Sequence, residues 1–150
     1  YTILFVGSVS VYKDIGEVRE AIETLIFVFA AERHTDEGIA RLRAAYEREF
    51  AAASADEVEA ARIAAGEFHE IAAELAGNEM LGELIAVFVT RLRWLFGQHD
   101  DLLGMAEEHR LILDAVAARD TDTLRWMIPR HLASGQEAAE RRLSDQAYSI

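Results

Sequence analysis

The 150-residue sequence contains no cysteine and only one proline. Without cysteine, neither a disulfide framework nor a thiolate metal site can form, and redox chemistry does not indicate a compartment. Long hydrophobic runs are also missing, since the longest nearly unbroken apolar stretches, residues 1–6 and 25–31, are too short to span a bilayer. The N-terminus lacks the basic region of a signal peptide, so we expect a cytoplasmic protein that does not engage a membrane.

Positive charge is scarce in this chain. Lysine and arginine together number 15 and the acidic residues 27, so the formal net charge is −12 with neutral histidines. Affinity for nucleic acid depends largely on clustered basic side chains, so direct contact with DNA is not expected. If the protein acts in DNA binding, a different segment must make the contacts with DNA. Hydrophobic residues make up 51% and charged residues 28%, which is typical of one globular domain at this length.

Alternation of period two, the pattern of half-buried strands, is missing over any length, whereas apolar residues recur every three or four positions. This periodicity predicts an all-α fold, an antiparallel bundle of about six helices joined by short loops. The expected inner faces of the first four helices are Val11, Ile15, Val18, Ile22, Leu25 and Phe29; Ile39, Leu42, Tyr46 and Phe50; Val58, Ala61, Ala65, Phe68, Ala72 and Leu75; and Leu81, Leu84, Ile85, Phe88, Leu92 and Leu95.

The chain is expected to divide near residue 11. Residues 1–11 form an apolar stretch that Gly7 and two serines interrupt. We interpret them as an extended linker or the remnant of an upstream segment. From there the helical pattern is continuous enough that residues 12–150 are expected to form one helical domain.

Polar residues mark the predicted helix ends. Thr35 offers a side-chain oxygen to cap the second helix. Ser54 and Glu57, three residues apart, fit a reciprocal capping box for the third helix. The pair Gly77 and Asn78 is expected to close the third helix and to start the fourth. These signals imply short connections between antiparallel neighbours.

Three histidines stand on predicted inner faces. His109 precedes Ile112 and Val116 at spacings of three and seven, which lie on one side of a helix. His69 stands in the same relation to the core face of its own helix. A single histidine on an apolar stripe is more often a hydrogen-bonded core residue than a ligand, but three such residues make a histidine cluster inside the bundle geometrically possible. The stripe that carries His131 also holds Leu124, Met127, Ile128 and Leu132.

Several longer motifs surround these histidines: EVREAIE, ERHTDEGIARLR, FHEIAAELAGNEML, EEHRLILDAVAARD and RHL. Together they resemble the FCD ligand-binding domain of GntR-type bacterial transcription regulators, over roughly residues 12–142. The resemblance implies an all-helical domain that binds a small carboxylate effector, often with a divalent metal held by one aspartate and three histidines. It also implies a homodimer whose DNA contacts are made by an N-terminal winged helix-turn-helix domain, which this sequence does not contain.

Carried over residue by residue, the metal ligands of that family fall on His69, His109 and His131. The aspartate does not carry over, because the position four residues before the first histidine is Ala65. Three imidazoles can still hold a divalent ion such as zinc or nickel and leave coordination positions for water or an effector oxygen. The affinity for the metal should be lower without the aspartate.

Three arginines are candidates for effector binding. Arg19 lies beside the seam of the first helix, where it is either a surface or ion-pair residue or, as the resemblance implies, a bidentate clamp for the effector carboxylate. Arg62 is three residues before Ala65 and could lean toward the vacated ligand position. Arg93 lies beside core positions of the fourth helix. A solvated helix face is the alternative for each of them.

Two other classes of function are weighed against an effector-sensing domain without catalysis. A metal-dependent hydrolase would use the histidine-bound ion to activate water, but Glu67 and Glu70 are not clearly placed as a general base. The adjacent pair His99 and Asp100 occurs in helical metal phosphohydrolases, yet here it lies in a polar break after the fourth helix. The second class is a bundle that only mediates association.

The single proline falls inside the last helical pattern. Pro129 lies two residues before His131 and removes the backbone donor to the carbonyl of Arg125. It is expected to kink the helix there and to re-aim the imidazole of His131.

Overall fold

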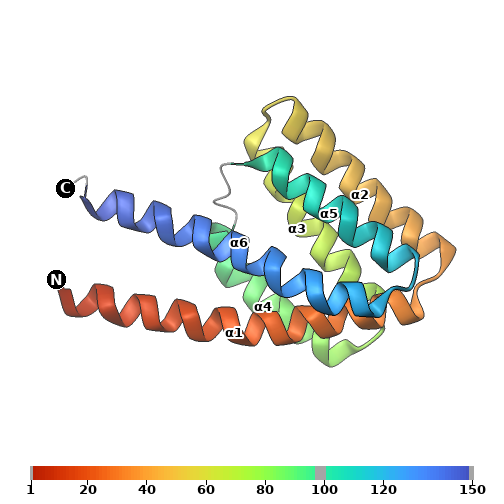
Figure 1. Ribbon diagram of the computed structural model, residues 1–150, viewed down its shortest axis with the longest axis horizontal. Coiled ribbons are helices and arrows are strands. Elements are labelled where there is room, and N and C mark those ends of the chain that lie inside the picture. The colour runs from red at the N-terminus through yellow and green to blue at the C-terminus, as the bar shows by residue number, and fades with distance from the viewer. Residues whose placement is uncertain (1, 97–100, 149–150) are drawn as a thin grey trace.

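A computed structural model describes the backbone of residues 2–96 and 101–148, and the side chains of residues 14–87, 101–137 and 141. Over these ranges the chain forms helices and no strand, which confirms the all-α bundle of about six helices (Figure 1). The helices are α1 (Thr2–Arg33), α2 (Asp36–Ser54), α3 (Val58–Leu75), α4 (Glu79–Phe96), α5 (Leu102–Ala117) and α6 (Thr121–Tyr148). None of these helices, as far as they are described, is both long and apolar enough to cross a membrane.

The two longest helices, α1 and α6, lie side by side and run in opposite directions (Figure 1). Helix α2 packs against α3 and α5, and α3 packs in turn against α1 and α4. Figure 1 shows α3 between the α1 and α6 pair and the outer α2 helix. Side chains from α1, α3, α5 and α6 can therefore meet in the interior of one bundle.

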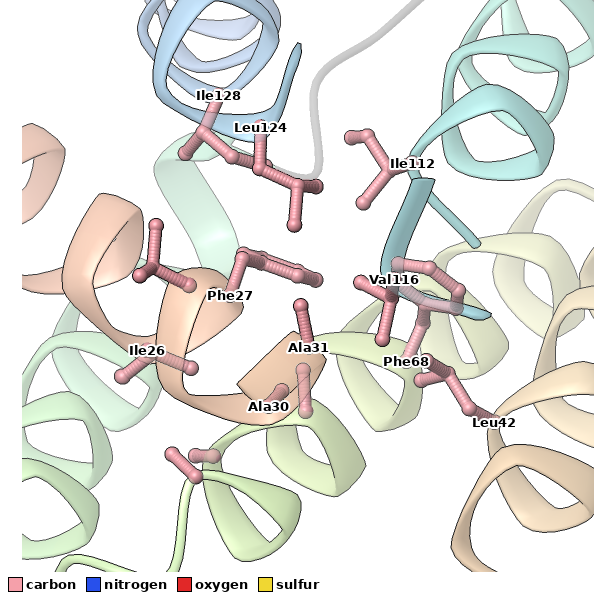
Figure 2. Packing of buried hydrophobic residues seen from close by; sticks show 14 of the residues in the cluster. Ile26, Phe27, Ala30, Ala31, Leu42, Phe68, Ile112, Val116, Leu124 and Ile128 are labelled. Atoms are coloured by element: carbon pink, nitrogen blue, oxygen red, sulfur yellow. The ribbon is translucent and has the colours of Figure 1, made fainter. Parts of the chain in front are cut away.

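The main core is built around two phenylalanines. Phe27 on α1 and Phe68 on α3 are both fully buried, with ring centroids 6.0 Å apart. Figure 2 shows Phe27 beside Leu124 and Val116, which come from α6 and α5. Complete burial of a large apolar side chain stabilises a fold by roughly 1.5–3 kcal/mol. Leu42 and Ala45 of α2 belong to the same core, so it fixes the relative positions of the five helices that carry the histidines and their partners.

The inner face of α1 differs from the predicted seam. Val18 is 49% exposed and Leu25 is 36% exposed, and Glu23 is the first buried residue among the described side chains of α1. Nearly every residue from 25 to 31 is apolar, so the periodicity does not single out one side of this helix. Phe50 on α2, Val58 on α3 and Leu84 on α4 were also expected inside and are exposed. The side chains of Val11, Phe88, Leu92 and Leu95 lie outside the described residues. Among residues 14–33, those that α1 buries are Glu23, Ile26, Phe27, Val28, Ala30 and Ala31.

The start of α3 corrects the predicted capping box. Ser54 is the last residue of α2, and Glu57 caps α3 without a side-chain hydrogen bond. The chain ends α2 in a Schellman motif: Asp56 has φ of 57°, its N–H donates to the carbonyl of Ala53, and the Glu57 N–H donates to the carbonyl of Ala52. The serine is therefore part of the ending of one helix and is not available to start the next.

The other predicted end signals are confirmed. The Thr35 hydroxyl accepts a hydrogen bond from the N–H of Gly38 at the start of α2. Gly77 follows α3 with φ of 58°, a left-handed conformation that favours glycine. The side-chain oxygen of Asn78 then accepts from the N–H of Leu81 in the first turn of α4. These turns keep the connections between α1, α2, α3 and α4 short.

The first residues of the chain were expected to be extended, and this expectation is wrong, because α1 already begins at Thr2. The division into a linker at 1–11 and a domain at 12–150 stays a prediction. Helix α6 continues through Pro129, so the proline does not end it. The re-aiming of His131 by a kink at this proline also stays a prediction.

Candidate metal centre

Three histidines from three helices converge in the interior. His69 on α3, His109 on α5 and His131 on α6 are buried, with exposed fractions of 8%, 1% and 8%. Their Nε2 atoms face one another: the distances are 3.2 Å between His69 and His109, 3.1 Å between His109 and His131, and 3.4 Å between His131 and His69. The structure thus brings together the three side chains that the inner-face pattern singles out, in a group that could hold a metal ion.

Each imidazole is bound on its other side by a glutamate. Nδ1 of His69 lies 2.5 Å from a carboxylate oxygen of Glu23, and Nδ1 of His109 lies 2.7 Å from one of Glu49. The third pair is His131 with Glu108, also at 2.7 Å. An ionised carboxylate can only accept a hydrogen bond, so each Nδ1 carries the proton and donates it. Each Nε2 then presents a lone pair.

Three nitrogen lone pairs in mutual contact are unfavourable unless a cation lies between them. A zinc-like ion about 2.0–2.1 Å from each nitrogen requires neighbouring nitrogens roughly 3.3 Å apart in tetrahedral geometry and about 2.9 Å apart in octahedral geometry. The observed separations of 3.1–3.4 Å are, taken together, closer to the tetrahedral value than to the octahedral one. The donor set and its spacing therefore fit a divalent ion such as zinc or nickel, with at least one coordination position left open.

Burial and ion pairing set the charges around the cluster. Burial alone would raise the pKa of the Glu23 carboxyl, but Arg19 and His69 outweigh that effect and hold this pKa well below its usual value. Glu23 is therefore an anion in the folded protein. Burial lowers the pKa of His131 to about 3, against the opposing effect of its hydrogen bond with Glu108. His131 is accordingly neutral at physiological pH, which is the form that binds a metal.

Aromatic rings hold two of the imidazoles in place. The ring of Phe68 stacks on that of His109, with centroids 4.6 Å apart and planes 17° apart. Phe27 meets His69 edge to face at 5.6 Å. These are residues of the main core, so the packing of that core also fixes the orientation of the histidines.

Ala65 lies one helical turn before His69 and is buried, with 8% of its surface exposed. It belongs to a second, smaller apolar cluster together with Met105, which lies one turn before His109 on α5. The remaining members of that cluster are Ala52, Ala53, Ala61 and Leu102. An apolar region thus adjoins the histidine cluster where the related proteins are expected to carry an acidic ligand.

The three candidate arginines have different surroundings. The guanidinium of Arg19 donates to the carboxylate of Glu23, so Arg19 joins the histidine cluster through that glutamate. Arg62 on α3 is half-buried, and its Nε is shielded from solvent without a hydrogen-bond partner. The side chain of Arg93 lies outside the described residues, as does the pair His99 and Asp100. Effector binding by any of these arginines stays a prediction.

Sequence reasoning missed the three glutamates. A glutamate is normally expected on the surface, and Glu23 was absent from the seam predicted for its helix. One signal was available: Glu23 lies four residues after Arg19, a spacing at which a glutamate and an arginine pair on one helix face. The partner of each glutamate lies at least 23 positions away in the sequence, so only the folded structure reveals it.

The model of the FCD domain family matches residues 14–134. This match covers most of the chain, and we conclude that the chain belongs to the FCD domain family. A search of curated proteins finds no match. The family match spans all three histidines and their three glutamates.

Proposed function

We propose that this chain is the effector-sensing domain of a GntR-type transcription regulator and that it binds a small organic carboxylate at a divalent metal ion held by His69, His109 and His131. The observation that carries this proposal is the convergence of three Nε2 atoms, each within 3.4 Å of the other two, while every Nδ1 is bound by a glutamate. Membership of the FCD family supports the regulatory role.

A cation at this point would explain why the effector is an anion. A carboxylate removed from water is tolerated only where a positive charge pairs with it. When bound, the ion supplies that charge and open coordination positions. Arg62 is a second candidate partner, because its Nε is buried without an acceptor and it lies on the same helix as His69. Zinc and nickel both suit three imidazoles.

Signalling would follow from the helices that the site joins. The histidines and glutamates come from α1, α2, α3, α5 and α6, so an occupied site ties five helices together. An effector that binds one packing of these helices better than another shifts the population toward it. Helix α1 carries Glu23, and it is the helix through which an upstream winged helix-turn-helix domain would receive the change. Such a regulator would act in the cytoplasm.

A homodimer would complete this arrangement. Helices α1 and α4 pack against each other, and both expose large apolar side chains of the kind that association can cover. Among the described side chains of these two helices, the exposed large apolar ones are Val18, Leu25, Met80, Leu84 and Val87. Sedimentation equilibrium tests the proposal: a monomer at micromolar concentration would contradict it.

The alternative is a metal-dependent hydrolase that uses the histidine-bound ion to activate water. Such an enzyme needs a general base within hydrogen-bond reach of the water. The glutamates nearest to the cluster accept hydrogen bonds from the Nδ1 atoms, on the side away from the converging Nε2 atoms. Glu67 pairs with Arg48 at the surface. These placements favour binding over catalysis.

Calorimetry tests the proposed function. We expect at least one member of a panel of dicarboxylates, tricarboxylates and sugar acids to bind the zinc-loaded domain, to raise its melting temperature and to be recovered unchanged. The same ligand should bind much more weakly to zinc-treated His109→Ala. If every anion fails to bind the zinc-loaded wild type, or if the ligand is hydrolysed, the proposal is wrong.

A further inference from the structure

The glutamates behind the histidines have a role of their own. We propose that Glu23, Glu49 and Glu108 are positioning residues that preform the divalent-metal site and supply, from behind the imidazoles, the negative charge that Ala65 does not provide. This inference rests on the proposed function, because it assumes that the histidines bind a metal. Its new content is that the affinity of the site depends on these three carboxylates.

The first step of the argument is geometric. Each glutamate accepts a hydrogen bond from one Nδ1, at 2.5 Å for His69 and 2.7 Å for His109 and His131. This bond selects the tautomer whose Nε2 is free to coordinate, and it fixes the direction of the ring. All three imidazoles are set in the same way, so no ring has to turn or exchange a proton before an ion binds.

The second step concerns charge. A carboxylate that accepts a hydrogen bond from Nδ1–H makes the imidazole more basic, so its Nε2 is a stronger ligand for the metal. The carboxylate also places a negative charge on the far side of the imidazole from the ion. Glu49 is fully buried and the Glu23 side chain is 2% exposed, so solvent screens these charges little. The Glu108 side chain is 41% exposed, so its charge is screened more strongly. The contributions of the three residues should therefore be unequal.

The third step concerns position 65. A carboxylate on the inner face one turn before His69 would be an anionic ligand, but the residue there is an alanine packed among apolar side chains. Three neutral imidazoles alone leave a divalent ion with its charge uncompensated in a buried place, which is unfavourable. The carboxylates of Glu23, Glu49 and Glu108 compensate the charge of the ion without occupying a coordination position. The open position stays available to an oxygen of the effector.

The test compares single glutamine substitutions in the full chain. Zinc affinity is measured by calorimetry with a competing chelator, and the melting temperature is measured with chelator alone. We expect Glu49→Gln and Glu23→Gln to bind zinc roughly 10- to 100-fold more weakly. The effect of Glu108→Gln should be smaller. Glu107→Gln is the matched control, since Glu107 neighbours Glu108 but is 53% exposed and pairs with Arg110.

The melting temperatures in chelator separate positioning from a general structural role. Glutamine is close to glutamate in shape and its oxygen can still accept from Nδ1–H, so metal-free Glu49→Gln should melt within a few degrees of wild type. Glu23→Gln also loses the ion pair with Arg19, so its metal-free melting temperature should be lower than that of Glu49→Gln. Wild-type zinc affinity in both Glu23→Gln and Glu49→Gln would overturn this inference and leave the proposed function standing. A collapse of the metal-free melting temperature that accounts for the whole loss of affinity would also overturn it. If the wild type itself binds no zinc, both proposals are wrong.

Discussion

The substitution Ala65→Asp gives two opposite effects that can be measured on one protein. Ala65 lies one turn before His69 on α3 and is buried in a small apolar cluster. Without metal, the new carboxylate is buried and unpaired there, which should destabilise the fold by about 3 kcal/mol. For a chain of this length, that lowers the melting temperature by roughly 6–12 °C.

With zinc, the same carboxylate lies on the face that carries His69 and can become a fourth, anionic ligand. We expect the affinity for zinc to rise about tenfold or more, which is about 1.4 kcal/mol. The variant should therefore gain roughly 3–6 °C more than wild type on addition of saturating zinc. Thermal unfolding of both proteins, in chelator and in zinc, measures both effects.

Ala61→Asp is the matched control for this experiment. Ala61 is fully buried in the same apolar cluster but lies one helical turn farther from His69. It should show the loss of stability in chelator without any added response to zinc. If Ala65→Asp and wild type gain equally from zinc, position 65 does not face the site. The correspondence between α3 and the ligand helix of the FCD family would then have to be redrawn.

Three further predictions concern pH, the effector and the proline. The pKa of His131 is lowered in the folded protein, so the metal-free domain should lose stability, by a few kcal/mol in all, as the pH falls from about 6.5 toward 3. Urea unfolding at a series of pH values measures this loss, and a free energy of unfolding that does not change with pH would contradict it. Arg62→Ala should weaken carboxylate binding by roughly tenfold, or about 1.4 kcal/mol, and leave zinc affinity unchanged, as calorimetry can show. Pro129→Ala restores an N–H donor to the carbonyl of Arg125, so it should raise the melting temperature in chelator, and it should weaken zinc binding because His131 is displaced. Unchanged zinc affinity would mean that the proline does not set the direction of this histidine.

The inward direction of the histidines could be predicted from helical periodicity, whereas the set of three that would bind a metal was implied by the resemblance to the FCD family. His109 and His131 stand on stripes of apolar residues with an unambiguous inner side, and the structure buries both. The same reasoning failed for α1, where residues 25–31 are apolar on every side and several faces could have packed inward. The choice among those faces is made by tertiary contacts, such as that of Phe27 with Phe68.

The glutamates could not be predicted for a related reason. A buried carboxylate is stable only with its partners, and those partners lie on other helices. Glu49 stands between Tyr46 and Phe50 on α2, but only the packing of α2 against α5 brings it to His109. The ends of the helices were more predictable, because caps such as Thr35 act within a few residues. The capping box of Ser54 and Glu57 was wrongly predicted because the end of α2 and the start of α3 share the same short segment.

The metal content of the purified domain tests the central claim most directly. After reconstitution with zinc or nickel at neutral pH and removal of free ion, elemental analysis should find one divalent ion per wild-type chain and almost none in His109→Ala. Occupancy should fall at acidic pH, because protons compete with the ion for the imidazoles. A wild-type domain that holds no metal, or a His109→Ala variant that holds as much as wild type, would contradict the account.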